Sequence, residues 1–197
     1  MARNSDPLLQ PLSIRGVTFR NRVMSTAHAT GFAEGGLTGE RYQLYHEQKA
    51  QGGIALTIFG GSSAVSADSP FGHIDVSSDR CIEPFRAFAQ RIHRHGAAIM
   101  CQISHLGRRS RADKGSWLPI VAPSATRDAL HRGFAKEMER HDITRIIADF
   151  AAAARRCREA GLDGVELLAT SHLIGQFLSP ASNRRTDAYG GSFENRC

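Results

Sequence analysis

Residues 54–61 read Ile54-Ala55-Leu56-Thr57-Ile58-Phe59-Gly60-Gly61, a continuous apolar run that ends in a pair of glycines. A run of this length without polar alternation is typical of a strand buried on both faces, as in a parallel sheet. The glycine pair predicts that the strand ends there. Residues 38–51 read as a helix, with Thr38 as a possible N-cap and Gly52 as a stop signal. A helix followed by a buried strand is the repeating unit of α/β folds.

The same unit recurs downstream of this strand. Helices are predicted over residues 81–95 and 144–160, and strands over residues 97–103 and 163–168. Their boundary signals are Gly96 and Gly161 as helix stops, and Asp142 or Thr144 as the N-cap of the second helix. A long loop covers residues 104–141.

Upstream, Arg15-Gly16 joins residues 12–14 and 17–19 into a predicted hairpin, and residues 22–27 read as a short strand. The chain therefore contains about four βα units after an N-terminal hairpin. A doubly wound sheet usually carries a glycine-rich phosphate loop after its first strand, and neither GxGxxG nor GxxxxGK[ST] occurs here. We therefore predict a TIM (β/α)8 barrel, of which residues 1–197 form a single truncated domain, the N-terminal half.

Composition limits the class of protein. Hydrophobic residues make up 41% and charged residues 22% of the 197 residues, which suits a globular protein. The net charge is +6, but the arginines are scattered, so we expect no nucleic-acid partner. No apolar run reaches the roughly 18 residues of a membrane helix, and residues 1–10 lack the apolar region of a secretory signal. We expect a cytoplasmic protein without a membrane partner.

The four cysteines do not predict a metal centre. Cys81, Cys101, Cys157 and Cys197 have wide spacings that fit no zinc or iron–sulfur motif. We interpret the first three as free buried thiols and expect neither a metal site nor an iron–sulfur cluster in this chain.

Small and polar residues follow four of the predicted strands. In a barrel, the carboxyl ends of the strands gather the functional residues, and small residues with a few directed polar groups suit a flat ring cofactor. The four clusters are Ala27-His28-Ala29-Thr30, Gly60-Gly61-Ser62-Ser63, Gln102-Ile103-Ser104-His105-Leu106-Gly107-Arg108 and Ala169-Thr170-Ser171-His172.

Three motifs resemble those of the Old Yellow Enzyme family, also called NADH:flavin oxidoreductases. The first two are Phe19-Arg20-Asn21-Arg22-Val23-Met24 and the run from Gln102 to Arg108. The third is the long signature Phe177-Leu178-Ser179-Pro180, Asn183-Arg184-Arg185-Thr186-Asp187, Tyr189-Gly190-Gly191-Ser192 and Glu194-Asn195-Arg196. The resemblance leans toward the branch of 2,4-dienoyl-CoA reductase, trimethylamine dehydrogenase and related N-demethylases. We interpret Arg184, Arg185, Asp187 and Glu194 as ion-pair and turn residues that fix the loop after the fourth strand.

The resemblance implies an FMN-dependent oxidoreductase with NAD(P)H as electron donor or acceptor. Ala27, His28 and Ala29 would lie along the flavin, Gly60 or Gly61 would approach its pyrimidine edge, and Gln102 would hydrogen-bond that ring. Related enzymes with covalent flavin carry a cysteine at position 29, so Ala29 implies non-covalent FMN.

The substrate half of the site departs from the family. Many members carry a His-x-x-His or His-x-x-Asn pair after the fourth strand, which grips a substrate carbonyl. Here that stretch is one residue shorter and keeps only His172. Because hydrogen-bond donors polarise the carbonyl during alkene reduction, oxidation of an N-methyl amine becomes a serious alternative to enone or enoyl reduction. We expect His172 and His28 to line the substrate face as catalytic residues.

The chain stops at what should be the fourth barrel helix. The family's remaining strands carry the flavin phosphate site, so we expect the isolated chain to bind FMN weakly, with open sheet edges and an exposed apolar inner face. Its partners would be a small-molecule substrate and either a second copy or the missing C-terminal half.

Two other interpretations stay open. The chain is a non-catalytic fragment without cofactor, or it is another TIM-barrel enzyme such as an aldolase. The latter lacks an obvious Schiff-base lysine, because Lys49, Lys114 and Lys136 all fall in predicted helices or loops.

Overall fold

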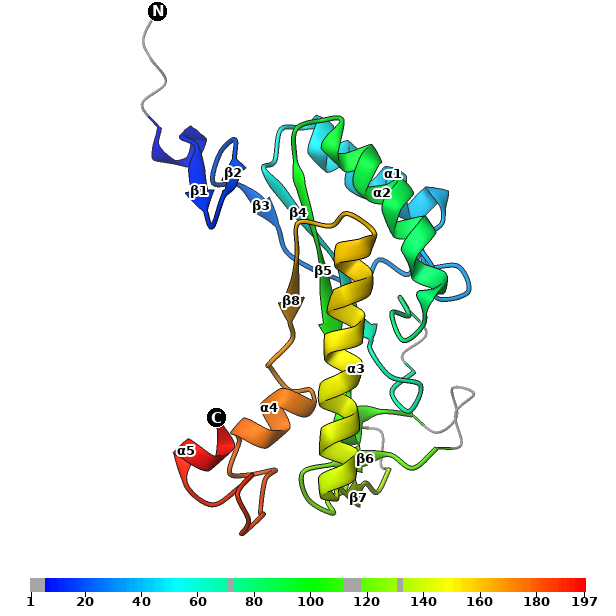
Figure 1. The fold of residues 1–197 in the computed structure, drawn as a ribbon, viewed down its shortest axis with the longest axis vertical. Coiled ribbons are helices and arrows are strands. Elements are labelled where there is room, and N and C mark those ends of the chain that lie inside the picture. The colour runs from blue at the N-terminus through cyan, green and yellow to red at the C-terminus, as the bar shows by residue number, and fades with distance from the viewer. Residues whose placement is uncertain (1–5, 71–72, 112–117, 131–132) are drawn as a thin grey trace, which may run out of the picture.

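The structure is a computed structural model that describes residues 6–70, 73–111, 118–130 and 133–197. Its centre is a parallel four-stranded sheet in the order β3-β4-β5-β8 (Figure 1). The strands are β3 (Met24–Ser25), β4 (Leu56–Ala64), β5 (Ala98–Ser104) and β8 (Gly164–Leu167). Spatial order follows chain order, so this sheet has no switch point of the kind found in doubly wound folds.

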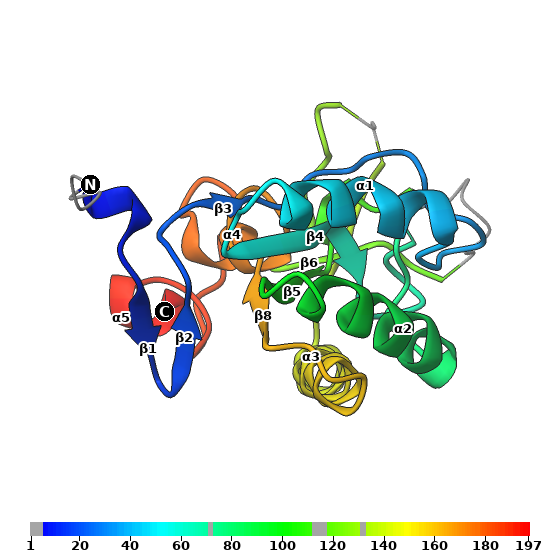
Figure 2. The same cartoon turned by 90° about the horizontal axis from the view of Figure 1, so that it is seen from above.

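Three helices pack together against one face of this sheet. They are α1 (Glu40–Gln51), α2 (Ile82–His93) and α3 (Arg140–Glu159), and Figure 2 shows them as an arc around the strands. Each helix connects two neighbouring parallel strands, which is the arrangement of a partial barrel. The shorter elements are η1 (Pro7–Leu9), β1 (Leu12–Ile14), β2 (Val17–Phe19), η2 (Asp79–Cys81), η3 (Gly107–Arg109), β6 (Val121–Ala122), β7 (Lys136–Glu137), α4 (Leu173–Leu178) and α5 (Phe193–Arg196).

The main core lies between the helices and the sheet. The ring of Phe59 from β4 meets the rings of Phe85 and Phe88 from α2, each with centroids 5.0 Å apart. All three side chains are fully buried, and each contributes roughly 1.5–3 kcal/mol of burial free energy. Ile99 and Cys101 of β5 extend the same cluster toward α3. The interpretation of Cys81, Cys101 and Cys157 as buried free thiols is confirmed.

The N-terminal hairpin is confirmed. Strands β1 and β2 pair antiparallel, and Arg15 and Gly16 between them have φ of 45° and 85°. Positive φ at both central residues is the type I′ geometry that matches the twist of a hairpin.

Residues of the first family motif close the end of the sheet at which the strands begin. The guanidinium of Arg20 donates to the carbonyl oxygens of Ala50 and Ile54 at 2.7–3.1 Å, and the amide of Asn21 donates to that of Gly53 at 2.8 Å. These acceptors lie where α1 ends and β4 begins, so the motif ties the end of the helix to the start of the strand.

The prediction that Gly60-Gly61 ends the central strand was wrong. Strand β4 continues to Ala64, and its pairing with β5 shifts register between Phe59 and Ser63. Gly60, Gly61 and Ser62 have φ of 112°, 60° and 81°. The glycines therefore form a bulge within the strand, because they accept positive φ without the steric penalty that other residues pay.

Three helix and strand boundaries also differ from expectation. The N-cap of α1 is Gly39, because Thr38 is buried beneath the helix. Helix α3 begins at Arg140, where Asp142 accepts a hydrogen bond from the backbone of Glu139 at 2.9 Å, so neither Asp142 nor Thr144 is the N-cap. The strand expected over residues 22–27 is confined to Met24–Ser25.

The predicted loop over residues 104–141 contains a small parallel sheet. Val121 and Ala122 of β6 pair with Lys136 and Glu137 of β7. Lys136 therefore lies in a strand, whereas Lys49 is helical as expected. Lys114 falls outside the described residues.

Strands β3 and β8 form the edges of the described sheet, and its inner face is partly exposed, as expected. Leu56 and Ile58 alternate with Phe59, point away from the helices and are buried, but Met24, in register with Leu56 on the same face, is 45% exposed. Further exposed apolar surface lies in a groove between α3, α4 and α5, where Ile147 is 62% and Leu167 is 55% exposed. In the described part of the chain, no helix has the length and apolar character to cross a membrane.

One buried histidine links stability to pH. His46 of α1 is fully buried, stacks on Tyr42, and bonds Thr57 through Nδ1 at 2.7 Å. Burial, together with the charge of Lys49, lowers the pKa of His46 to about 3. In the unfolded chain His46 has its ordinary pKa near 6.5, so below that pH the unfolded chain binds the proton more readily than the folded chain does. The folded state is therefore progressively destabilised relative to the unfolded state as pH falls from 6.5 toward 3.

We predict that the free energy of unfolding falls by about 2 kcal/mol between pH 7 and pH 5 because of His46. His46→Phe removes this contribution, since phenylalanine keeps the stacked ring without a titrating group. Urea titrations of both proteins across this pH range check the prediction. Parallel pH curves for the two proteins would contradict it.

Candidate functional site

His28 follows β3 and is held by hydrogen bonds at both ring nitrogens. Its Nδ1 lies 3.1 Å from the carbonyl oxygen of Thr26, and its Nε2 lies 2.7 Å from the hydroxyl of Tyr45. A carbonyl only accepts, so Nδ1 carries hydrogen and Nε2 of the neutral ring accepts from Tyr45. Lys49 lies 4.2 Å over the ring of Tyr45. His28 is therefore oriented by α1, with neither nitrogen left unbonded.

The bulge in β4 is packed against the segment that carries His28. A Cβ on Gly61 would overlap the backbone of His28 and Ala29, and one on Gly60 would overlap Ser63 and the backbone of Gln102. The hydroxyl of Tyr42 accepts a hydrogen bond from the Gly60 amide at 3.0 Å. The two glycines thus let three strand ends approach each other closely.

Gln102 of β5 joins this bulge to the neighbouring strand. Its Oε1 accepts from the backbone amide of Ser62 at 3.0 Å, and its Nε2 donates to the carboxylate of Glu166 on β8 at 2.5 Å. Because a backbone amide only donates, the orientation of the Gln102 amide is fixed. Within the described residues, the second N–H of Nε2 has no acceptor.

Glu166 is a site residue that the sequence analysis missed. It pairs in register with Gln102 across β5 and β8. The available signal was a single carboxylate within an otherwise apolar strand, which is unusual enough to indicate a polar partner across the sheet.

His172 follows β8 and precedes α4. Its side chain is 7% exposed, and its Nδ1 lies 2.7 Å from the hydroxyl of Ser104 at the end of β5. Burial lowers the pKa of His172 to about 4, aided by the charge of Arg109. His172 is therefore neutral near pH 7.

A buried ion network fixes the loop that follows β5. His105 accepts the Gly107 amide at Nδ1 and donates from Nε2 to Asp68 at 2.9 Å. The other carboxylate oxygen of Asp68 accepts from Arg145 of α3. Burial raises the pKa of Asp68, but the hydrogen bonds from His105, Ser66 and Arg145 outweigh it and hold the pKa well below its usual range. Sequence patterns gave no signal for Asp68, because its partners are distant along the chain.

Gln176 ties the same loop to α4. Its Nε2 donates to the carbonyl oxygen of Leu106 at 2.9 Å, and its Oε1 accepts from the Arg108 amide at 3.0 Å. Gly107 has a φ of 60°, and a Cβ there would displace the Gln176 amide, so this turn favours glycine. The backbone amide of Leu173 donates to the carbonyl oxygen of His105 at 2.8 Å. The position of His172 thus depends on the end of β5.

The long signature braces the loop after β8. Arg185 donates to the carbonyl oxygens of Pro123 and Met138 at 2.9 and 2.7 Å and forms an ion pair with Asp187. The interpretation of Arg185 and Asp187 as ion-pair residues is confirmed. Arg184 contributes its backbone amide, which donates to Ser124 at 2.9 Å.

The expected site residues fall into two groups. Ala27, His28, Ala29, Gly60, Gly61 and Gln102 form a continuous set across β3, β4 and β5. His172 belongs to the other edge of the sheet, where β8 ends. Two strands separate β3 from β8, so the described structure places His28 and His172 apart. Within the described residues, no three His, Cys, Asp or Glu side chains are arranged to hold a metal ion.

A sequence profile of the NADH:flavin oxidoreductase / NADH oxidase family matches residues 7–197. The chain belongs to this family. Its members are flavin-dependent oxidoreductases, so the resemblance seen in the motifs is confirmed and the enzyme class follows from it.

Two curated relatives of the family match nearly the whole chain. The multifunctional alkene reductase/demethylase OYE of Caballeronia cordobensis is 54% identical over 98% of this chain and 29% of its own length. The N,N-dimethylglycine/sarcosine dehydrogenase of Chromohalobacter salexigens is 51% identical over 97% of this chain and 28% of its own length. The chain therefore spans less than a third of the length of these two relatives.

A solved structure supports the fold. The Old Yellow Enzyme homologue from Zymomonas mobilis superposes with a TM-score of 0.89 at 28% identity, over 96% of this chain and 56% of that chain. The predicted N-terminal half of a TIM barrel is confirmed by this partial coverage and by the order of the parallel strands.

The packing of the bulge predicts a large difference between two glycine substitutions. Gly61→Ala and Gly161→Ala both place a methyl group at positive φ, which costs about 1–2 kcal/mol. Gly161 has open space around it, whereas Gly61 faces the His28 and Ala29 backbone. We expect Gly61→Ala to destabilise by a further 1–3 kcal/mol or so, measured by urea titration. Equal effects would show that the bulge is not closely packed.

Proposed function

We propose that this chain is the N-terminal half of an FMN-binding barrel in an oxidoreductase that acts on N-methyl amines. The observation that carries the proposal is the single His172 at the end of β8, bonded to Ser104, in a chain about half identical to a demethylase and a dimethylglycine/sarcosine dehydrogenase. Enone reduction is the second candidate, because the Caballeronia relative is also named an alkene reductase.

The residues at the ends of β3 and β5 fit a flat flavin ring. Ala27 and Ala29 carry small side chains, with Ala29 exposed, and Gln102 keeps one N–H free for a ring acceptor. We propose that Ala27, His28 and Ala29 lie along the ring and that Gln102 donates to its pyrimidine edge. Ala29 leaves the flavin non-covalent at that position. Gly60 and Gly61 are proposed to bring the backbone of the bulge toward the same edge.

FMN, when bound, supplies the hydride chemistry, with NAD(P)H as the second redox partner. The residues of this chain orient the reactants. His28 is held by Tyr45 and the Thr26 carbonyl, so it contributes a fixed ring surface beside Ala29. His172 is neutral and presents its remaining nitrogen to the substrate side.

The remainder of the barrel is proposed to come from further polypeptide, in the same chain or in another. The groove between α3, α4 and α5 exposes Ile147 and Leu167, and both edges of the sheet are unpaired. Without that half, the chain would be the non-catalytic fragment that the sequence analysis left open.

We predict that the 197-residue chain alone loses FMN when excess flavin is removed by gel filtration, because the family's phosphate site lies on later strands. The ratio of flavin absorbance to protein checks this. A stoichiometric flavin complex would show that half a barrel suffices.

We predict that a flavin-loaded protein carrying this chain within a complete barrel is reduced by N-methyl amines. Anaerobic mixing should bleach the visible flavin band, and His172→Ala should slow that reduction by about tenfold or more. His141→Ala, on the exposed start of α3, is the matched control and should leave the rate unchanged. Unchanged reduction in His172→Ala would remove His172 from the mechanism.

A further inference from the structure

The tautomer of His172 follows from the burial of Ser104. The Ser104 side chain is buried, and its hydroxyl has the imidazole Nδ1 of His172, at 2.7 Å, as its hydrogen-bond partner within the described residues. A buried hydroxyl hydrogen without an acceptor is unfavourable. Ser104 therefore donates to Nδ1, and the neutral ring carries its hydrogen on Nε2.

The Nε2 of His172 is available to a ligand. Within the described part of the chain it makes no hydrogen bond. The fully buried side-chain nitrogen and oxygen atoms that lack a hydrogen-bond partner there belong to Thr38, His46, Arg108 and Ser110, so Nε2 of His172 is not among them. Nε2 therefore keeps contact with solvent. His172 presents a hydrogen-bond donor there, not a base.

A guanidinium stands beside this donor. Arg109 donates from Nη1 to the hydroxyl of Ser171 at 3.1 Å, directly before His172 in the chain. Within the described residues, Arg109 forms no ion pair with a carboxylate, unlike Arg145 and Arg185. Because Ser171 is the neighbour of His172, this hydrogen bond places the Arg109 guanidinium near His172, and its charge helps to lower the pKa of His172.

We propose that His172 and Arg109 form a subsite for the carboxylate of an N-methyl amino acid, and that Ser104 is the positioning residue that keeps His172 as a donor. A neutral N–H and an unpaired guanidinium complement an anionic oxygen pair, since charge-assisted hydrogen bonds to carboxylates are the strong ones. The inference rests on the proposed function and adds a requirement for a carboxylate on the substrate.

The first experiment measures the subsite without flavin. Protein with isotope-labelled histidine is titrated with sodium acetate, and nitrogen–proton spectra follow the ring of His172. We expect hydrogen on Nε2, a shift of that signal on adding acetate, and acetate affinity lower by about tenfold in Arg109→Gln.

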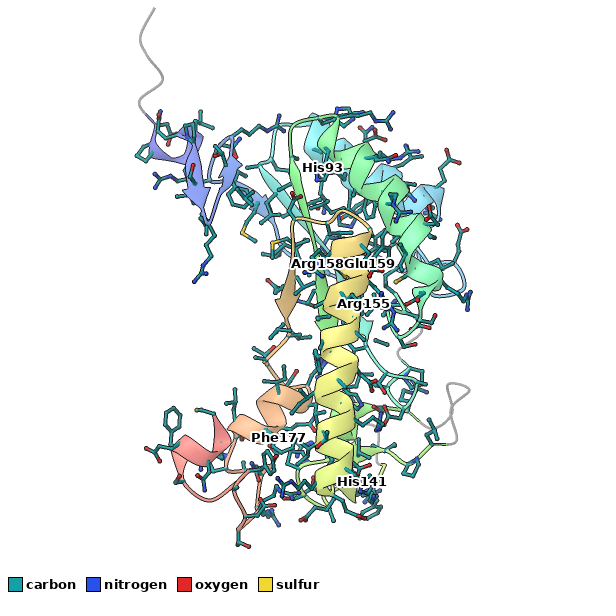
Figure 3. The ribbon with its side chains drawn as sticks, in the orientation of Figure 1. His93, His141, Arg155, Arg158, Glu159 and Phe177 are labelled. Carbon is teal, nitrogen blue, oxygen red and sulfur yellow. The ribbon has the colours of Figure 1, made fainter. Side chains whose placement is uncertain are left out.

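Matched variants separate acetate binding at this subsite from the effect of removing a positive charge elsewhere on the protein. Arg158→Gln removes a positive charge near the far end of α3, away from α4, and should leave acetate affinity unchanged (Figure 3). Ser104→Ala should mix the two ring tautomers of His172, and Ser104→Thr should restore the Nε2 form. Hydrogen on Nδ1 in the unaltered protein, or equal acetate affinity in Arg109→Gln, would overturn the proposal.

The second experiment uses the flavin-loaded protein and compares sarcosine with its methyl ester. We expect a KM for the ester about tenfold or more higher, and Arg109→Gln should remove this difference through KM, not kcat. Equal KM values would overturn the carboxylate subsite while leaving amine oxidation intact. If neither compound reduces the flavin but acetate still binds at His172, the proposed function fails and the subsite stands.

Discussion

The packing of β4 against α2 is the constraint on which the rest of the structure depends. Phe59 points into the cluster formed with Phe85 and Phe88, and Ile99 of β5 joins it from the next strand. Because side chains alternate along a strand, this fixes which face of the sheet meets the helices. All three long helices then lie on that face, and the carboxyl ends of the parallel strands gather at one rim.

At this rim, backbone geometry and polar bonds replace apolar packing. The bulge at Gly60 and Gly61 brings β4 against the His28 segment, and Gln102 bonds both the bulge and Glu166. Within the described residues these bonds pair the polar groups of Gly60, Ser62 and Gln102, so the part of the rim that we propose to hold flavin is preorganised. Preorganised donors are effective because they need no rearrangement when charge develops.

The other part of the rim, where we propose that substrate binds, is built differently, from loops fixed by buried polar groups. His105, Asp68 and Arg145 anchor the turn after β5, and Gln176 joins that turn to α4. The position of His172 therefore depends on this turn. This arrangement holds a histidine in a defined orientation after β8.

The sequence alone determined the repeating order of helices and buried strands, since apolar periodicity and glycine stops are local signals. Long motifs in the sequence also identified the family, and Arg185 and Asp187 were predicted among the ion-pair and turn residues, although their pairing with each other was not. The continuation of β4 through Gly60 and Gly61 was not predictable, because glycine signals a break in isolation and becomes a bulge only when β5 lies alongside. Asp68 and Glu166 were recognised only from their hydrogen bonds to His105 and Gln102, which lie 37 and 64 residues away along the chain. Tertiary structure decided these roles, because burial of a charge depends on contacts that no local pattern encodes.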